Sequence, residues 1–151
     1  MKMQFFFPFI FCTLISCLNG QINSKEDKKL NDSILIIEMN LSAFGVESDN
    51  FPSINVYIDF SKDSSICKKS FYNPKYKDSK YSLTKNEMET LLQLLKISDL
   101  EKLKKEYTVN RTDQPRSKTI IYTIKNKFSI NDYGLEGKYP LPELYKIVYK
   151  L

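Results

Sequence analysis

The sequence opens with an apolar stretch, residues 5–16, that divides the chain into a leader and a folding part. The stretch is about twelve residues long, whereas a membrane-spanning helix needs about twenty and the core of a signal peptide roughly seven to fifteen. Lys2 supplies the positive charge that is typical of the segment before such a core. We therefore expect residues 1–16 to be a cleaved signal peptide, which leaves residues 17–151 for the mature protein.

The apolar stretch ends in a short motif around a cysteine. Leu14, Ile15 and Ser16 are followed directly by Cys17. This tetrapeptide resembles the lipobox of bacterial lipoproteins, which implies cleavage before Cys17 and acylation of that residue. Several acyl chains anchor a protein stably in a lipid bilayer, where one chain anchors it marginally. We expect a lipoprotein of the cell envelope that faces the periplasm or the cell exterior; the alternative is an ordinary secretory leader with a chance cysteine.

The segment after the lipobox and the number of cysteines constrain the rest of the mature chain. Residues 17–32 are polar and charged without apolar periodicity, so we expect the lipidated cysteine to be followed by a flexible tether. Cys12 leaves with the leader and Cys17 is acylated, so Cys67 has no partner for a disulfide within the chain. The fold must therefore depend on its hydrophobic core, in which we expect Cys67 to be a small buried residue.

The first half of the folding part alternates between apolar and polar residues with the period of a strand. We expect strands at residues 33–42, 54–60 and 66–72, with a hairpin turn at 61–64 and an irregular segment at 73–82 that ends in a short strand. The residues expected to face the core are Leu35, Ile37, Met39 and Leu41 in the first strand and Ile54, Val56, Ile58 and Phe60 in the second.

The centre of the sequence has helical periodicity. Thr84 and Glu87 have the spacing of a capping box, and Leu83 and Met88 that of a hydrophobic staple, so a helix is expected to begin here. A second capping-box spacing predicts another short helix over 98–107. The apolar stripe expected on the first helix consists of Met88, Leu91, Leu92 and Leu95.

Two strands and a helix are expected near the C-terminus. Residues 118–125 and 128–133 surround a hairpin signal, and Pro140 precedes a helix with the stripe Leu144, Ile147, Val148 and Leu151. The complete order is β-β-β-α-α-β-β-α. We therefore predict a single α+β domain over residues 33–151, with an antiparallel sheet of about five strands and three short helices on one face.

The composition excludes several kinds of chemistry. The chain has no histidine, which rules out Ser-His-Asp and Cys-His catalysis and removes the commonest ligand of transition metals. It has no glycine-rich phosphate loop and no Cys-x-x-Cys. We expect no cofactor and no metal. Glu47, Asp49 and Asn50 are a weak candidate for a hard cation such as calcium, the alternative being a simple polar loop.

The lysines are spread along the chain, as expected for a solvated surface. The net charge is +5, a mild excess. The Tyr- and Lys-rich segment 72–81 could pair with a polyanion, or it could be an exposed connection whose rings lie at the edge of the core. Because the protein is expected to be exported, we expect no nucleic-acid partner.

The chain from about Leu41 to its end resembles a family of small bacterial envelope proteins classed only as a domain of unknown function. Two cysteines of the family's first loop are absent here, where Phe44 and Phe51 stand near Gly45 and Pro52. The resemblance implies no established activity, and its motif residues Thr112, Asp113, Pro115, Asp132 and Tyr133 are the candidate site. The other matching residues are Tyr57, Asp63, Tyr107, Gln114, Pro140 and Leu144.

Three functions are compatible with the sequence. The first is a membrane-tethered, non-enzymatic binding or interaction domain whose partner is another envelope protein or a small ligand. The second is a small envelope hydrolase that uses Asp113 or Asp132, and the third is an immunity-type protein that inhibits a toxin. A deep polar cleft with two carboxylates would favour the hydrolase. A flat or convex tyrosine-rich face would favour binding.

Overall fold

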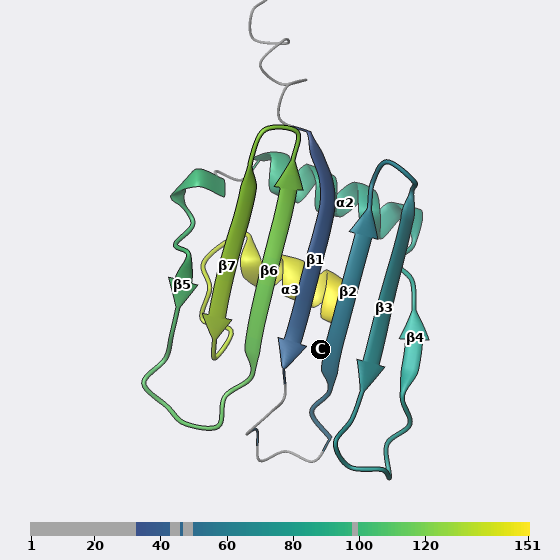
Figure 1. The fold of residues 1–151 in the computed structure, drawn as a ribbon, viewed down its shortest axis with the longest axis vertical. Coiled ribbons are helices and arrows are strands. Elements are labelled where there is room, and N and C mark those ends of the chain that lie inside the picture. Colours follow the sequence, from purple (N-terminus) through teal and green to yellow (C-terminus); the bar gives the residue numbers. More distant parts are fainter. Residues whose placement is uncertain (1–32, 43–45, 47–49, 98–99) are drawn as a thin grey trace, which may run out of the picture.

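Seven strands form one sheet in the order β4-β3-β2-β1-β6-β7-β5 (Figure 1). The computed structural model describes residues 33–42, 46, 50–97 and 100–151. Both α-helices lie behind the sheet in this view, so they cover one face only. The strands are β1 (Ile34–Ser42), β2 (Ser53–Asp59), β3 (Ser64–Ser70), β4 (Ser79–Tyr81), β5 (Glu106–Tyr107), β6 (Arg116–Thr123) and β7 (Lys127–Tyr133), and the helices are α2 (Lys85–Ile97), the 3-10 helix η1 (Leu100–Lys102) and α3 (Leu141–Tyr149).

The fold is a single domain, but its sheet is larger than predicted and mixed rather than antiparallel. The expected helix over 98–107 is wrong, because the described part of this segment forms η1 and then β5. β5 runs parallel to β7, and the Asn131 N–H donates to the Lys105 carbonyl at 2.9 Å. By pairing with β7, β5 forms hydrogen bonds with backbone groups at the edge of that strand. A helix at this place would leave those groups without hydrogen-bond partners. The described chain therefore has two α-helices where three helices were expected.

A bulge changes which residues of β1 face the core. The pairing of β1 with β6 shifts register between Ile34 and Ile36, and Ile34 is buried while Leu35 is 38% exposed. An extra residue in one strand reverses the alternation beyond it. The expected inward position of Leu35 is therefore wrong, whereas those of Ile37, Met39 and Leu41 are confirmed.

The second strand follows its predicted alternation until its end. Ile54, Val56 and Ile58 are buried as expected, and Phe60 packs partly buried against the core from the turn that follows β2. Asp59, the last residue of β2, is buried although its side chain is charged. Its carboxylate accepts hydrogen bonds from the Ser61 hydroxyl at 2.6 Å and the Ser61 N–H at 3.1 Å, so it fixes the turn between β2 and β3.

The predicted start of α2 is confirmed. The Glu87 N–H donates to Thr84 Oγ1 at 3.2 Å, and the Thr84 N–H donates to Glu87 Oε2 at 2.7 Å, as a capping box requires. Leu83 and Met88 are both buried, which is consistent with the expected staple. Of the rest of the stripe, Leu91 and Leu95 are buried, and Leu92 packs against the core partly buried.

The last helix buries a wider face than predicted. Lys150 adopts a left-handed conformation (φ 53°) that ends α3, so Leu151 lies beyond the helix and is 54% exposed. Its expected place in the stripe is therefore wrong. The Lys150 ammonium forms an ion pair with Glu87 Oε1 at 2.9 Å, which links the end of α3 to the start of α2. The buried residues of α3 are Leu141, Leu144, Tyr145, Val148 and Tyr149.

Cys67 lies in β3 beneath the helices and is completely buried, as expected. Burial raises the pKa of its thiol to about 11, so the thiol is protonated at neutral pH. A protonated, inaccessible thiol is a poor nucleophile, which fits a structural role. None of the described helices is both long enough and apolar enough to cross a bilayer.

Candidate functional site

The two halves of the predicted motif meet at the end of β7. The Gln114 N–H donates to the Tyr133 hydroxyl at 3.3 Å, and the Gly134 N–H donates to the Pro115 carbonyl at 2.8 Å. Thr112 and Asp113 extend from this junction into solvent. Asp113 has a φ of 58°, and its side chain forms no hydrogen bond with the described residues. The motif thus joins a loop to a strand.

Asp132 points to the side of the sheet that the helices cover and is completely buried. Its Oδ1 accepts the Glu136 N–H at 2.8 Å, and its Oδ2 accepts the Gly137 N–H at 2.9 Å and the Tyr145 hydroxyl at 3.0 Å. A Cβ at position 137 would lie 2.5 Å from Oδ2, so only glycine allows this approach. Asp132 thus fixes the loop that follows its strand. It holds that loop against α3.

A buried polar cluster surrounds this carboxylate under α3. Tyr145 stacks on Tyr149 with ring centroids 5.5 Å apart, and Tyr149 shares a 2.8 Å hydrogen bond with the Ser117 hydroxyl. Burial raises the pKa of the Asp132 carboxyl above its ordinary value and outweighs the lowering effect of the hydrogen bonds to it. Burial also raises the pKa of both tyrosines. Because these groups are removed from solvent, the cluster is suited to fixing α3 on the sheet rather than to binding a substrate.

The exposed surface with the most developed pattern is the side of the sheet away from the helices, here called the open face. Strand register aligns its side chains in rows that cross the strands. One row is mostly apolar and aromatic and contains Ile120, Glu38, Tyr57 and Ile66 in this order. The next row, here called the polar row, contains Asn131, Lys118, Asn40, Asn55, Lys68 and Lys80.

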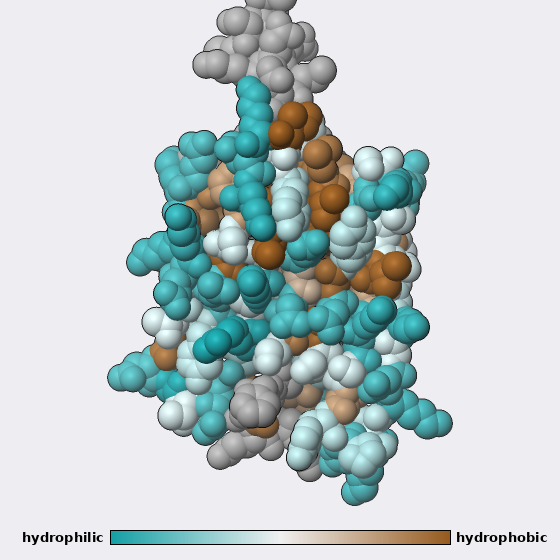
Figure 2. All heavy atoms as spheres, viewed as in Figure 1, coloured by the Kyte–Doolittle hydropathy of each residue, from teal (hydrophilic) through white to brown (hydrophobic). Residues whose placement is uncertain are grey.

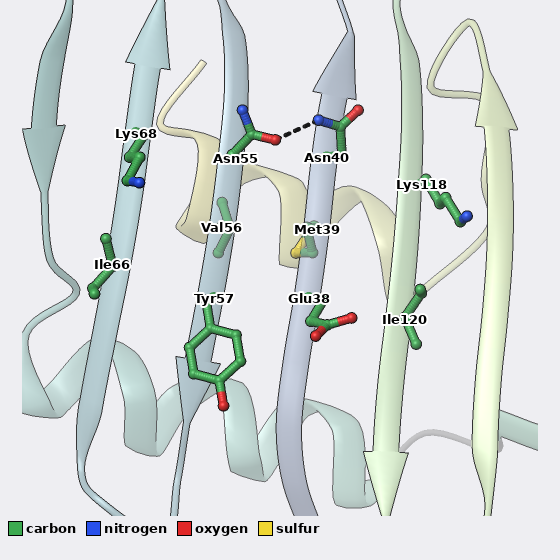
Figure 3. Close-up of a pocket in the computed structure, with 10 residues that line it drawn as sticks. All are labelled: Glu38, Met39, Asn40, Asn55, Val56, Tyr57, Ile66, Lys68, Lys118 and Ile120. Carbon is green, nitrogen blue, oxygen red and sulfur yellow. Dashed lines mark hydrogen bonds between the residues drawn. The ribbon is translucent and has the colours of Figure 1, made fainter.

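Both rows border a shallow depression of about 440 Å³ (Figure 3). At its upper rim in this view, Asn40 Nδ2 donates to Asn55 Oδ1 at 2.6 Å. Lys118 and Lys68 stand on either side of this amide pair. They lie three strand spacings apart, which corresponds to roughly 14 Å. The depression therefore has Tyr57, Ile66 and Ile120 along one side and, along the other, the amide pair with a lysine at each end.

The charge of the open face is predominantly positive. Arg116, Lys118 and Lys127 of β6 and β7 and Lys68 and Lys80 of β3 and β4 share this side. The acids on the same side are Glu38 and Glu106, and Glu38 accepts a hydrogen bond from the Tyr122 hydroxyl at 3.0 Å. Figure 2 shows this face, with hydrophilic residues over most of it and apolar residues towards its upper end.

Other predicted binding positions contribute less to this surface. In the Tyr- and Lys-rich segment, Tyr72 is 99% exposed, and Tyr76 packs on Phe71 with centroids 5.3 Å apart. Tyr81 turns towards the helices, where its hydroxyl donates to the Val148 carbonyl at 2.7 Å. The three rings therefore do not share one binding surface. Among the described residues, no group of three or more acidic, cysteine or histidine side chains is placed to hold a metal ion.

Some predicted positions cannot be placed. Leu14, Ile15, Ser16 and Cys17 lie outside the described residues, and so do Glu47 and Asp49 of the weak cation candidate.

Comparison with protein families gives one match, to the domain of unknown function DUF6438, over residues 49–151. The chain belongs to this family. The expectation of a domain of unknown function is thereby confirmed. The match includes the candidate site residues Thr112, Asp113, Pro115, Asp132 and Tyr133, whereas Gly45 lies before its first residue. Searches of curated proteins and of solved structures give no match for the DUF6438 chain.

The open face of the DUF6438 domain was not identified as a site from the sequence. The sequence contains part of the information, because Asn40 and Asn55 stand at outward positions of their strands. Lys118 joins them only because β6 pairs with β1, although the two strands are far apart in the sequence. A row that crosses strands depends on register between distant segments, which the sequence of each strand does not specify.

Proposed function

We propose that this chain is a membrane-tethered, non-enzymatic lipoprotein of the cell envelope, and that its open face binds another envelope protein. The observation that carries the proposal is the uncovered side of the sheet, where Tyr57, Ile66 and Ile120 lie beside the polar row. Apolar side chains that gather on an exposed surface with a polar border are a common mark of a protein-binding site. The alternative is that this face is simply in contact with water, as one face of many antiparallel sheets is. Cross-linking from the open face distinguishes a binding surface from a solvated one.

The form of the depression favours a protein over a small molecule. Sites for small ligands are concave and enclose most of the ligand, whereas this depression is shallow and lies across the four antiparallel strands β3, β2, β1 and β6 (Figure 3). A surface that combines a tyrosine and aliphatic groups with amide and charged groups matches the mixed composition of protein interfaces. The lysines at both ends favour a partner whose contacting surface is acidic.

The alternative of a hydrolase has less support. Hydrolysis by a carboxylate pair requires both acids to reach one substrate bond across a cleft. Asp132 is completely buried and already accepts three hydrogen bonds, while Asp113 lies in solvent on the loop. Neither acid borders the depression on the open face.

Photo-cross-linking in cells tests the binding surface. A photoreactive aromatic amino acid in place of Tyr57 should yield an adduct of discrete mass with another envelope protein, because its ring lies at the depression. The same substitution at Tyr72, which is more exposed but lies on the loop between β3 and β4, is the matched control. Lys118→Glu should reduce the adduct without changing the melting temperature. Equal adducts from Tyr57 and Tyr72, or none from Tyr57, would contradict the proposal.

Acylation of Cys17 supplies the tether in this proposal. It is supported by the lipobox of the sequence and by the length of the apolar stretch before it. Cys17→Ser should abolish incorporation of a labelled fatty acid and release the protein from the membrane fraction, whereas Cys12→Ser, within the leader, should leave both unchanged. A Cys17→Ser protein that still incorporated the label would show that the anchor lies elsewhere.

A further inference from the structure

The first described residues place the point where the chain enters the domain. Ile34 pairs with Thr123 at the end of β6, and Ile36 pairs with Asp59 at the end of β2. The β2–β3 turn and the β6–β7 turn therefore lie at the same end of the sheet as Ser33 (Figure 1). We call this end, made of Ser33, Leu35, residues 60–63 and residues 124–127, the entry end.

The entry end exposes aliphatic side chains. Ile124 is 54% exposed and Leu35 38% exposed. Backbone hydrogen bonds hold them close together in the sheet, since the Ile124 N–H donates to the Ser33 carbonyl at 3.2 Å and the Phe60 N–H donates to the Leu35 carbonyl at 3.0 Å. Figure 2 shows apolar residues gathered at this end of the open face. A substantial part of each side chain is therefore open to water.

Lysines surround this apolar surface. Lys62 is 75% exposed in its side chain and pairs with the buried carboxylate of Asp59 at 2.9 Å. Lys125 and Lys127 flank the tip of the β6–β7 turn, and Lys127 stands 5.1 Å from the centroid of the Tyr122 ring. Lys104, Lys105 and Glu101 border the hollow beside Lys127. Asp63 is the exposed acid of the β2–β3 turn, so cations exceed acids around the entry end.

We propose that the entry end docks on a bilayer surface of anionic phospholipids, with Ile124 and Leu35 in the interface and the lysines among the headgroups. This inference depends on the proposed anchoring through Cys17. The sixteen peptide steps from Cys17 to Ser33 span at most roughly 55 Å, so the entry end is the part of the domain whose distance from the anchor is most restricted. Exposed aliphatic groups within a ring of lysines are the features by which proteins lie on anionic bilayers. A weak contact between the entry end and the bilayer is sufficient for docking, because the tether raises the effective concentration of the membrane surface near the domain.

Docking would give the open face a fixed direction. The strands run away from the entry end, so the polar row would stand above the headgroups and face along the membrane rather than into it (Figure 1). The partner of the open face would then approach from the side. The loop that contains Tyr72, at the other end of β3, would point away from the bilayer.

Tryptophan fluorescence tests the docking, because the chain contains no tryptophan of its own. The acylated protein with Ile124→Trp is reconstituted into vesicles of equal parts phosphatidylcholine and phosphatidylglycerol with brominated acyl chains, which quench tryptophan on contact. We expect its emission to fall about twofold or more and to shift to shorter wavelength, as for a residue in the interface. Tyr72→Trp is the matched control and should keep its emission. Adding Lys125→Gln and Lys127→Gln to Ile124→Trp, or omitting phosphatidylglycerol, should restore most of the emission.

The outcomes separate the docking from the anchor. Vesicle flotation of the same samples reports whether the protein is anchored at all. If the protein floats with the vesicles but Ile124→Trp is not quenched, or is quenched no more than Tyr72→Trp, the docking is wrong and the anchoring stands. If the acylated protein does not float, both are wrong. Quenching that is unchanged by the loss of the lysines and of phosphatidylglycerol would overturn the anionic specificity.

Discussion

Asp113 and Asp132 belong to the two halves of one motif, but one carboxylate is exposed to solvent and the other is completely buried. Asp113 stands in solvent in a left-handed conformation, whereas Asp132 is buried under α3 with three donors around it. The burial of Asp132 has no compensating cation among the described residues, and its pKa is raised for that reason. The residue thus contributes hydrogen bonds that organise a loop, while its burial makes the charged form of the carboxyl less favourable.

At the scale of single residues, Asp132→Asn should destabilise the domain by about 1–3 kcal/mol in acid. The amide keeps an oxygen for the Gly137 N–H and the Tyr145 hydroxyl, but its NH₂ group faces the Glu136 N–H and leaves that donor unpaired. Urea denaturation at a series of pH values measures this difference. Asp113→Asn is the matched control and should stay within about 0.5 kcal/mol, because the side chain is exposed and asparagine tolerates the left-handed conformation.

The penalty of Asp132→Asn should become smaller as the pH rises. A carboxyl whose pKa is raised on folding gives its full stabilisation below the pKa of the unfolded chain, about 3.9 for aspartate. That stabilisation is lost as the pH rises through the higher folded pKa, because the folded protein must then bury a charge. The asparagine variant has no such loss. A penalty that grew between pH 4 and 7 would show that hydrogen bonds to the charged form outweigh burial.

At the scale of elements, α2 shows how a local signal can determine a helix start. The capping box is formed by residues three positions apart, so no distant contact is needed to specify it. The segment 98–107 contained the same spacing of Ser98 and Glu101, yet its described part is a 3-10 helix and a strand. Tyr107 is buried in β5, and the edge of β7 provides a pairing partner that the sequence pattern does not reveal. Tertiary pairing therefore overrides a local helix signal here.

Two threonines of this helix should respond oppositely to the same substitution. Thr84→Ala should cost about 1 kcal/mol, because the Glu87 N–H loses its acceptor. Thr90→Ala should be neutral or slightly stabilising, because the Thr90 hydroxyl only donates back to the Asn86 carbonyl and alanine is the better helix former. Thermal and urea unfolding of the two variants would measure the contrast. Similar losses at both positions would argue against a specific cap.

The core stripe of α2 should be more sensitive than its cap. Leu91 is completely buried, so Leu91→Ala should cost roughly 2–5 kcal/mol through lost burial and a cavity. Leu92 is only partly buried, and Leu92→Ala should cost less than Leu91→Ala. Equilibrium urea denaturation would establish the order. If Leu92→Ala were the more damaging, the rotation of α2 on the sheet would have to differ from the one described.

At the scale of the whole molecule, one face of the sheet packs against the helices to form the core, and the open face is exposed. Helices cover the first, and very short strands, β4 and β5, close both edges, which limits pairing with other chains. Alternation in the sequence predicted most of the inward side chains of β1 and β2, because burial follows the period of a strand. The open face could not be predicted as a site, since Asn40, Asn55 and Lys118 come together only through the order of the strands.

The same isoleucine substitution on the two faces should separate stability from binding. Ile58→Thr places a hydroxyl in the completely buried side of β2 and removes core volume, so it should cost roughly 2–4 kcal/mol. Ile66→Thr lies on the open face, where the side chain is 54% exposed, and threonine keeps the β-branched shape that strands favour. We expect its unfolding free energy to change by less than about 0.5 kcal/mol, while the cross-link from position 57 falls because Ile66 is the strand partner of Tyr57. Unfolding curves and adduct yields measured on the same preparations would decide. A stable Ile66→Thr protein with an undiminished adduct would remove the open face from the binding surface, whereas a strongly destabilised one would mean that this side of the sheet is also part of the core.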